Sequence, residues 1–219
     1  MDIVVRDATE ADLPAIVDIY NQSIPAGWST ADTSPITVEE RIAWFREFDP
    51  NRRPIWVGEW ESNIIGWVSL SSFYCGRHAY QATAEISLYI ATSMQRQGIG
   101  LYLKRWAISQ CPRLGITTLL SMYFDHNAAT QRINESLGFE PCGHLRDIAV
   151  VQGEKRGLII AALRIPPARK SADMADSASG GCEPSEGTDV PCQARSRQSN
   201  NACERPRQSG GRKRNTSVG

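Results

Sequence analysis

Apolar and polar positions alternate along the first 165 residues in patterns that predict both strands and helices. Runs rich in β-branched and aromatic residues predict strands at 3–6, 55–60, 64–71, 83–90, 117–123, 148–151 and 158–164. Apolar residues at helical spacing predict helices that begin near Leu13, Val38, Gly100 and Ala128. Capping boxes at Thr9–Asp12 and Thr37–Glu40 support the first two. The element order is then β-α-α-β-β-β-α-β-α-β-β.

This order predicts the fold class. A helix separates the strand at 83–90 from the strand at 117–123, and such a crossover joins two parallel strands. Short turns join the strands at 55–60 and 64–71, and those at 148–151 and 158–164, as in antiparallel hairpins. We therefore expect an α/β fold in which helices flank a mixed, mostly antiparallel sheet with one parallel strand pair.

The composition changes sharply near residue 166. Every Trp, Tyr and Phe lies at or before Phe139, and the last Ile or Leu is Ile165. Residues 166–219 are rich in Ser, Gly, Pro, Arg, Asn and Gln, and they offer too little apolar surface to offset the entropy of ordering them. We expect one folded domain at residues 1–165 and a disordered low-complexity tail at residues 166–219.

The charge and composition exclude several classes of protein. Twenty-four basic residues balance 24 acidic ones, which argues against nucleic-acid binding through bulk charge. No apolar run reaches the roughly 18 to 20 residues of a membrane-spanning helix, and the N-terminus lacks the order of a signal peptide. The cysteines and histidines show no metal-ligand spacing. We therefore expect a cytoplasmic protein with no membrane, nucleic-acid or metal partner.

The segment from Glu85 to Gly100 carries the most specific chemical signal. A strand runs into a loop that contains Gly98 and Gly100, and a helix starts there. Such glycines let backbone N–H groups approach a phosphate, and the helix N-terminus adds partial positive charge. The third glycine of a dinucleotide-binding fingerprint is missing, as is the Gly-Lys-Ser/Thr of a P-loop. The loop is either a main-chain anion site of another kind or a place where glycines let the helix pack on the sheet.

The order Gln-x-x-Gly-x-Gly after a strand resembles the acyl-CoA pyrophosphate loop of the GCN5-related N-acetyltransferase (GNAT) superfamily. The resemblance covers about residues 3–164 and includes Glu10–Leu13, Ile64–Trp67 and Asn127 with Asn134–Phe139. The sequence Gly-Arg-His-Ala-Tyr at 76–80 resembles the phosphinothricin acetyltransferase branch, which acetylates the amine of small amino-acid-like compounds. The resemblance implies an enzyme that uses acetyl-CoA as co-substrate, and a sheet that splays between its parallel strands.

The resemblance also implies how acetyl-CoA binds. Its pantetheine arm would lie like an extra strand along Leu88, Tyr89 and Ile90, while main-chain amides of the loop wrap the pyrophosphate. Asn127 is either a side-chain contact to the cofactor, a helix N-cap, or both. Within the loop, the arginine either adds charge or is an ordinary surface residue. The implied loop residues are Arg96, Gln97, Gly98, Ile99, Gly100 and Leu101.

Glu85 is expected to be the general base, mostly because of this resemblance. An α-amine has a pKa of roughly 8 and must lose a proton before it attacks a thioester. A carboxylate beside the acceptor can take that proton directly or through water, and partial burial would raise its pKa. The alternative is a solvated strand acid or an ion pair. We expect direct transfer without an acyl-enzyme, with the thioester oxygen polarised by a main-chain N–H near Leu88.

The proton donor to the leaving thiolate is not identified by the sequence. Many relatives place a Tyr or a His where this chain has Asn134, and an amide does not donate a proton in this sense. Tyr89 and Tyr123 are alternatives that otherwise serve packing. A thiol with a pKa of roughly 8.5 also allows solvent to supply the proton.

The acceptor is the least determined part of the prediction. Trp28, Arg77 and Tyr80 are the candidate acceptor-binding residues, with core packing as the alternative for the aromatic ones. Residues 153–158, Gly-Glu-Lys-Arg-Gly-Leu, lack the aromatic and acidic signature of the near relatives, which puts phosphinothricin itself in doubt. We favour an N-acetyltransferase for small amino-acid-like amines. A protein or peptide N-acetyltransferase, or a non-catalytic acyl-CoA sensor, stays open, as does a homodimer.

Overall fold

The computed structural model describes residues 1–166, so the predicted disordered tail lies outside the described residues apart from Pro166. Seven strands form one sheet in the order β1-β2-β3-β4-β5-β7-β6. β4 and β5 are parallel, and every other pair of neighbours is antiparallel. The predicted fold class is confirmed. The strands are β1 (Val4–Asp7), β2 (Ile55–Trp60), β3 (Asn63–Ser72), β4 (Thr83–Ile90), β5 (Thr118–Phe124), β6 (Glu140–Val151) and β7 (Glu154–Arg164).

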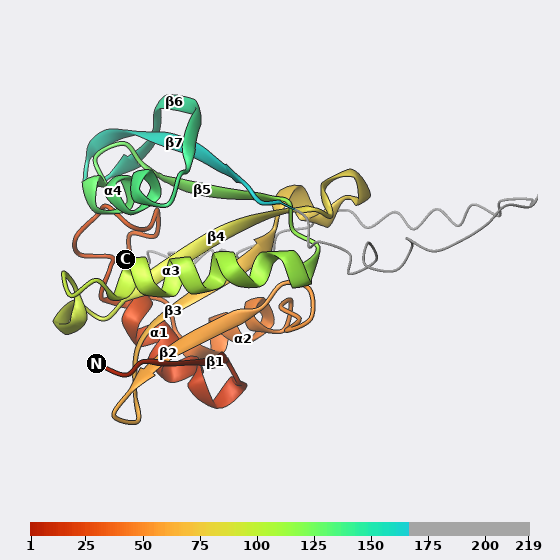
Figure 1. Ribbon diagram of the computed structural model, residues 1–219. Helices are drawn as coiled ribbons and strands as arrows, with labels where there is room; N and C mark the ends of the chain where they lie inside the picture. The colour runs from red at the N-terminus through yellow and green to blue at the C-terminus, as the bar shows by residue number, and fades with distance from the viewer. Residues whose placement is uncertain (167–219) are drawn as a thin grey trace, which may run out of the picture. The chain divides into compact units, whose positions relative to one another are not determined.

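Four α-helices accompany the sheet: α1 (Leu13–Asn21), α2 (Val38–Phe45), α3 (Ile99–Gln110) and α4 (Ala128–Ser136). α3 crosses in front of the sheet in Figure 1. Its residue Leu103 packs in one apolar cluster with Ile86 of β4, whereas Ile16 of α1 packs in a second cluster with Trp67 of β3. The two faces of the sheet therefore carry separate cores. Within residues 1–166, no helix is long and apolar enough to span a membrane.

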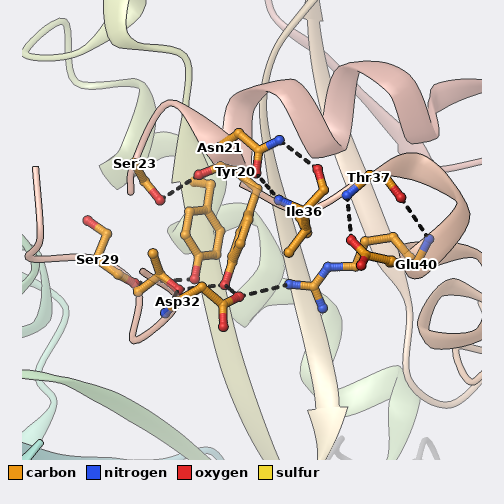
Figure 2. Close-up of polar contacts among 11 residues, drawn as sticks. Tyr20, Asn21, Ser23, Ser29, Asp32, Ile36, Thr37 and Glu40 are labelled. Carbon is orange, nitrogen blue, oxygen red and sulfur yellow. Dashed lines mark hydrogen bonds and ion pairs between the residues drawn. The ribbon is translucent and has the colours of Figure 1, made fainter. Parts of the chain in front are cut away.

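The predicted helix starts are confirmed by their caps. The Thr9 N–H donates to the Asp12 carboxylate at 2.8 Å, ahead of a short 3₁₀ turn that leads into α1. The Thr37 N–H donates to Glu40 at 2.8 Å, and the Thr37 hydroxyl accepts from the Glu40 N–H at 3.3 Å (Figure 2). These bonds satisfy backbone donors that the first turn of a helix leaves without partners.

The last hairpin corrects the prediction. Its strands are longer than expected, and only Gln152 and Gly153 form the turn, with φ of 52° and 81°. Two consecutive positive φ angles are typical of a tight I′ hairpin. The expected loop at 152–157 was therefore wrong, because Glu154 onward belongs to β7. β6 is an edge strand, exposed along most of its length, so its side chains show no apolar alternation that would have predicted it.

Candidate active site

The parallel strands β4 and β5 separate along their length. They pair only at Thr83–Glu85 with Thr118–Leu120. Beyond that point β4 continues to Ile90 and β5 to Phe124 without further pairing, and the two strands diverge (Figure 1). We call the space between residues 86–90 and residues 121–124 the wedge. An unpaired strand edge can accept an extended ligand as an added strand.

The amide of Leu88 is directed into the wedge. The Ala91 N–H donates to the Ile65 carbonyl on the β3 side at 3.0 Å. On the other side, the Ala82 carbonyl accepts from the Thr117 N–H at 2.9 Å. Since the two edges of a strand alternate residue by residue, the even-numbered amides of β4 face β5. The splay that the sequence implied by resemblance is thus present, with a donor aimed into it.

A cavity of about 70 Å³ lies in the wedge. It brings together Trp28, Leu88, Tyr89 and Asn127, which are four of the predicted site residues. It is also lined by Lys104, which the sequence analysis did not single out. The wedge therefore brings part of the predicted cofactor and acceptor residues together.

The start of α3 leaves backbone donors open, as the glycine pattern predicted. Gly98 is the N-cap with φ of 81°, and the first helical bond runs from the Tyr102 N–H to the Gly98 carbonyl at 3.0 Å. The N–H groups of Ile99, Gly100 and Leu101 meet no acceptor within residues 1–166. Three adjacent open amides at a helix N-terminus form an anion site. A cavity of about 490 Å³ adjoins this turn.

Gly100 serves packing as well. A Cβ at Gly100 would lie 3.3 Å from Ile133 of α4 and 3.4 Å from Leu88 of β4. The second glycine therefore lets α3 approach both the wedge and α4. Arg96 has φ of 61°, its side chain is exposed, and it forms no hydrogen bond or ion pair within the described residues. Its guanidinium is available to an anion at the turn.

Glu85 lies where β4 and β5 begin to separate. Its side chain points away from the α3 face, because its neighbours Ala84 and Ile86 belong to the α3 cluster. The carboxylate is half-buried, and it forms no hydrogen bond or ion pair with any other residue that the structure describes. Burial raises its pKa above the ordinary value. An ion pair is thus not the role of Glu85, and a desolvated carboxylate binds a proton more readily.

Asn127 is the N-cap of α4. Its Oδ1 accepts from the Thr130 N–H at 3.0 Å, and its Nδ2 donates to the Trp28 carbonyl at 2.9 Å. The structural role that the sequence suggested is confirmed, and the cofactor contact stays a prediction. Because Asn127 holds Trp28, it joins α4 to the loop at residues 23–36, which we call the acceptor loop. The Trp28 side chain is 48% exposed at the wedge.

The acceptor loop is fixed from α1 and β4 (Figure 2). The Tyr20 hydroxyl donates to Asp32 at 2.5 Å and bonds to Thr30 at 2.5 Å. The Tyr89 hydroxyl donates to the Ser29 carbonyl at 3.2 Å. The amide of Asn21 accepts from the N–H of residue 36 at 3.0 Å and donates to its carbonyl at 2.8 Å. The loop beside the wedge is thus held in one conformation, which a site that orients a small acceptor requires.

The acceptor loop also contacts the last hairpin and the segment after β5. Gln152, in the β6–β7 turn, donates to the Pro25 carbonyl at 2.8 Å, and the His126 ring bonds to the Gly27 carbonyl at 3.2 Å. The sequence analysis did not predict these contacts. Polar side chains in a turn and after a strand give no signal of which distant carbonyl they meet.

Arg77 and Tyr80 lie elsewhere. They belong to the segment between β3 and β4, at the end of β4 opposite the wedge (Figure 1). The Arg77 guanidinium lies 4.9 Å from the ring centre of Tyr74, and Tyr80 packs edge-on against Phe73 at 5.4 Å. Neither lines the wedge cavity. Their role in acceptor binding stays a prediction.

The two tyrosines considered as proton donors are poorly suited to that role. Tyr89 stacks on Trp67 at 4.6 Å between ring centres and packs at a tilt against Tyr20 at 4.9 Å, and burial raises its pKa. Burial also raises the pKa of Tyr123. Asn134 is only 1% exposed. Its carbonyl accepts from the ammonium of Lys104 at 2.5 Å.

Lys104 is the residue that sequence analysis missed. It is 2% exposed, and its pKa is lowered to about 7 by burial. A signal was present, since Gly100, Leu103, Lys104 and Ala107 share one helical face and only the lysine interrupts its apolar character. No cluster of three His, Cys, Asp or Glu within residues 1–166 could hold a metal ion.

A family model described as "Acetyltransferase (GNAT) domain" matches residues 2–140, which include the wedge and the turn at Gly98. The chain belongs to the GNAT family. It is an acyl-CoA-dependent N-acetyltransferase, and the predicted superfamily and enzyme class are confirmed.

Named relatives point to one branch. "Putative phosphinothricin acetyltransferase YwnH" of Bacillus subtilis (strain 168) is 40% identical over 157 residues, which cover 71% of this chain and 95% of that protein. The "L-methionine sulfoximine/L-methionine sulfone acetyltransferase" of Pseudomonas paraeruginosa is 26% identical, covering 78% of this chain and 99% of that one. The solved phosphinothricin acetyltransferase of Sinorhizobium meliloti in complex with AcCoA has a TM-score of 0.71 at 26% identity, covering 75% of this chain and 89% of that one. The predicted resemblance to this branch is confirmed.

Proposed function

We propose that the protein transfers the acetyl group of acetyl-CoA to the primary amine of a small amino-acid-like compound. The observation that carries this proposal is the wedge: an unpaired edge of β4 leads from the open amides at Gly98 to the desolvated carboxylate of Glu85. An unpaired strand edge beside open helix N-terminal amides suits an extended arm with an anionic end, and acetyl-CoA has that form.

Different groups of the chain bind the cofactor, stabilise the developing charge and accept the proton. The N–H groups of Ile99, Gly100 and Leu101 hold the pyrophosphate, and the edge of β4 pairs with the pantetheine amides. The Leu88 N–H donates to the thioester oxygen and stabilises the negative charge that develops there. Glu85 accepts the proton of the attacking amine. The fixed acceptor loop positions that amine against the thioester.

The acceptor class is supported by the relatives, whose names specify phosphinothricin, methionine sulfoximine and methionine sulfone. All three are small compounds that carry an α-amino acid group. Trp28 at the wedge provides a face for a short side chain. Arg77 is a candidate to bind the acceptor's carboxylate. This requires either that the segment between β3 and β4 moves toward the wedge, or that it contributes to the site of a second copy of the chain.

A thiol-release assay with acetyl-CoA and a panel of amines tests the proposal. The panel contains phosphinothricin, methionine sulfoximine, methionine sulfone, the common amino acids, and peptides with free N-termini or lysines. We expect turnover with one or more of the small amino acids and none with peptides. Turnover confined to peptides would assign the chain to protein N-acetylation instead.

The sensor hypothesis makes a different prediction in the same assay. A sensor binds CoA by calorimetry but releases no thiol with any amine. Parallel calorimetry with CoA therefore separates an enzyme whose acceptor is outside the panel from a protein that does not bind CoA at all. The latter result would overturn the proposed function.

A further inference from the structure

A buried lysine amine lies at the inner wall of the wedge. Lys104 projects from α3, and its Nζ donates to Asn134 Oδ1 of α4 at 2.5 Å and to Ser121 Oγ of β5 at 3.0 Å. All three residues are at least 98% buried, and Lys104 and Ser121 line the wedge cavity. Three polar groups from three elements thus converge on the interior end of the wedge.

No carboxylate balances this amine. Lys104 forms no ion pair within residues 1–166. Its Nζ also makes a cation–π contact with the face of the Phe139 ring, 4.7 Å from Nζ to the ring centre. The titratable and charged side chains on the elements packed against it are Glu85 and Tyr89 on β4, Tyr123 on β5, and Arg132 and Glu135 on α4. None of them is a cause of the Lys104 pKa shift, which burial alone produces. A buried amine without a counter-ion is costly to stability and indicates a functional role.

We propose that Lys104 is the general acid of the acetyl transfer: its ammonium gives a proton to the thiolate that leaves when the acetyl group moves to the amine. This proposal rests on the proposed function. Lys104 and Glu85 lie on opposite sides of β4, because Lys104 is on α3 and Glu85 points away from the α3 face. A thioester that lies along the edge of β4 would therefore have Glu85 toward one face of the sheet and Lys104 toward the other.

The step is balanced in atoms and electrons. A bond forms between the amine nitrogen and the carbonyl carbon, and the carbon–sulfur bond breaks with its electron pair left on sulfur. The nitrogen loses one proton to Glu85, and the sulfur gains one proton from Lys104. The products are the N-acetylated amine and the free thiol. Water then takes the proton from Glu85 and restores one to Lys104, and no redox partner is needed.

Asn134 and Ser121 orient the donor. Both accept from Nζ, and the third N–H of the ammonium has no acceptor within residues 1–166. The pKa of about 7 makes Lys104 a stronger acid than the departing thiol, which has a pKa of roughly 8.5.

The test is Lys104→Met, which keeps the volume and removes the amine, with Arg105→Met as the matched control. Arg105 is the next residue on α3, carries the same charge and is exposed. For Lys104→Met we expect kcat to fall by about 10²-fold or more and the affinity for CoA to stay within about threefold. The melting temperature should not fall, because a desolvated charge has been removed. Arg105→Met should resemble the parent protein in all three measurements.

The pH profile of kcat provides a readout that a structural role would not change. A general acid must be protonated, so kcat of the parent falls as the pH rises through the Lys104 pKa, and this limb is absent in Lys104→Met. NMR titration of the Lys104 side chain in the parent should give the same pKa as the limb. This second measurement needs no variant to fold.

Several results would overturn the assignment. They are an unchanged kcat in Lys104→Met, a Lys104 titration that does not match the kinetic limb, or loss of the limb in Tyr123→Phe instead. Acetylation of Lys104 during turnover, seen as an acetyl mass gain on its peptide, would also overturn it, since an amide has no such proton. Absence of CoA binding by the parent would refute the proposed function and is distinguishable from all of these.

Discussion

The carboxylate of Glu85 is half-buried and has no hydrogen-bond or ion-pair partner within residues 1–166. We expect Glu85→Gln to lower kcat by about 10²- to 10⁴-fold, because the amide keeps the shape but accepts no proton. Burial raises the pKa of Glu85, and a base must be ionised, so kcat of the parent should fall as the pH drops through that raised pKa. The variant should lack this limb. Steady-state kinetics over a range of pH measure both effects.

The control for this experiment is Glu61→Gln in the exposed turn between β2 and β3, which should leave the kinetics unchanged. CoA affinity, measured by calorimetry, should be the same in all three proteins. A Glu85→Gln variant that retains both its kcat and its acidic limb would show that the base lies elsewhere.

The ion pair between Arg6 and Asp12 makes stability depend on pH. Arg6 donates to both oxygens of Asp12 at 2.8 Å and 2.9 Å, and these bonds lower the pKa of Asp12 to about 2. A depressed carboxyl pKa contributes stability that is fully present above the ordinary value and is lost as the pH falls toward 2. Arg6→Gln should therefore reduce the free energy of unfolding by about 1 kcal/mol at pH 7, since Arg6 is partly in water.

Denaturant unfolding of the parent and the variant at pH 7 and at pH 3 measures this effect. The difference between the two proteins should shrink at the lower pH, where Asp12 begins to take a proton in the unfolded chain. A difference that is independent of pH would mean that Arg6 stabilises the fold through its packing rather than through its charge.

At the scale of single residues, the sequence singled out Glu85 as a candidate but not Lys104. Glu85 was chosen mostly by resemblance to a family, and because an acid among apolar strand residues is unusual. Lys104 was overlooked because a lysine beside two exposed helical positions looks like a surface residue. Its burial depends on Ser121 and Asn134, which lie 17 and 30 residues away, and only tertiary structure brings them together.

Among the elements, the turn into α3 is the one on which cofactor binding depends. We expect Gly98→Ala to weaken CoA binding by about tenfold or more, because φ of 81° is unfavourable for alanine and the open amides would shift. Gly115→Ala is the matched control: its φ is 68°, and a Cβ at either glycine meets nothing within 4 Å. Both variants carry similar backbone strain, but only one of them lies at the anion site.

Calorimetry with CoA and thermal unfolding separate the two effects. Both variants should lose a similar amount of stability, while only Gly98→Ala loses affinity. Equal CoA affinity in the two variants would place the pyrophosphate away from this turn.

The elements differ in how well the sequence predicts them. β4 has the predicted bounds, because its buried residues alternate with Glu85, Ser87 and Tyr89 on a strand that is covered on both faces. β6 was predicted at four residues and has 12. An edge strand is defined by the partner to which it hydrogen-bonds, and Pro141 and Gly143 within it argue against a strand when the sequence is read alone.

At the scale of the whole described molecule, the site depends on the point where β4 and β5 stop pairing. The sequence predicts that β4 and β5 are parallel, since a helix joins them. The sequence does not predict the length over which they pair, because that length depends on tertiary contacts. Asn134 of α4 packs against β5, and Gly100 of α3 packs against Leu88 of β4. The wedge could therefore be expected only from resemblance to a family, while its donors and its lysine required the structure.

The described residues also predict what deletion of residues 167–219 does. β7 ends at Arg164, the buried apolar residues end at Ile165, and every residue of the wedge and the acceptor loop precedes them. We expect the truncated chain to keep the kcat, the CoA affinity and the melting temperature of the full chain. Kinetics and thermal unfolding of the two proteins provide the comparison. A lower melting temperature would show that the deleted residues stabilise the domain, and a changed Michaelis constant for the amine alone would show that they contribute to acceptor binding.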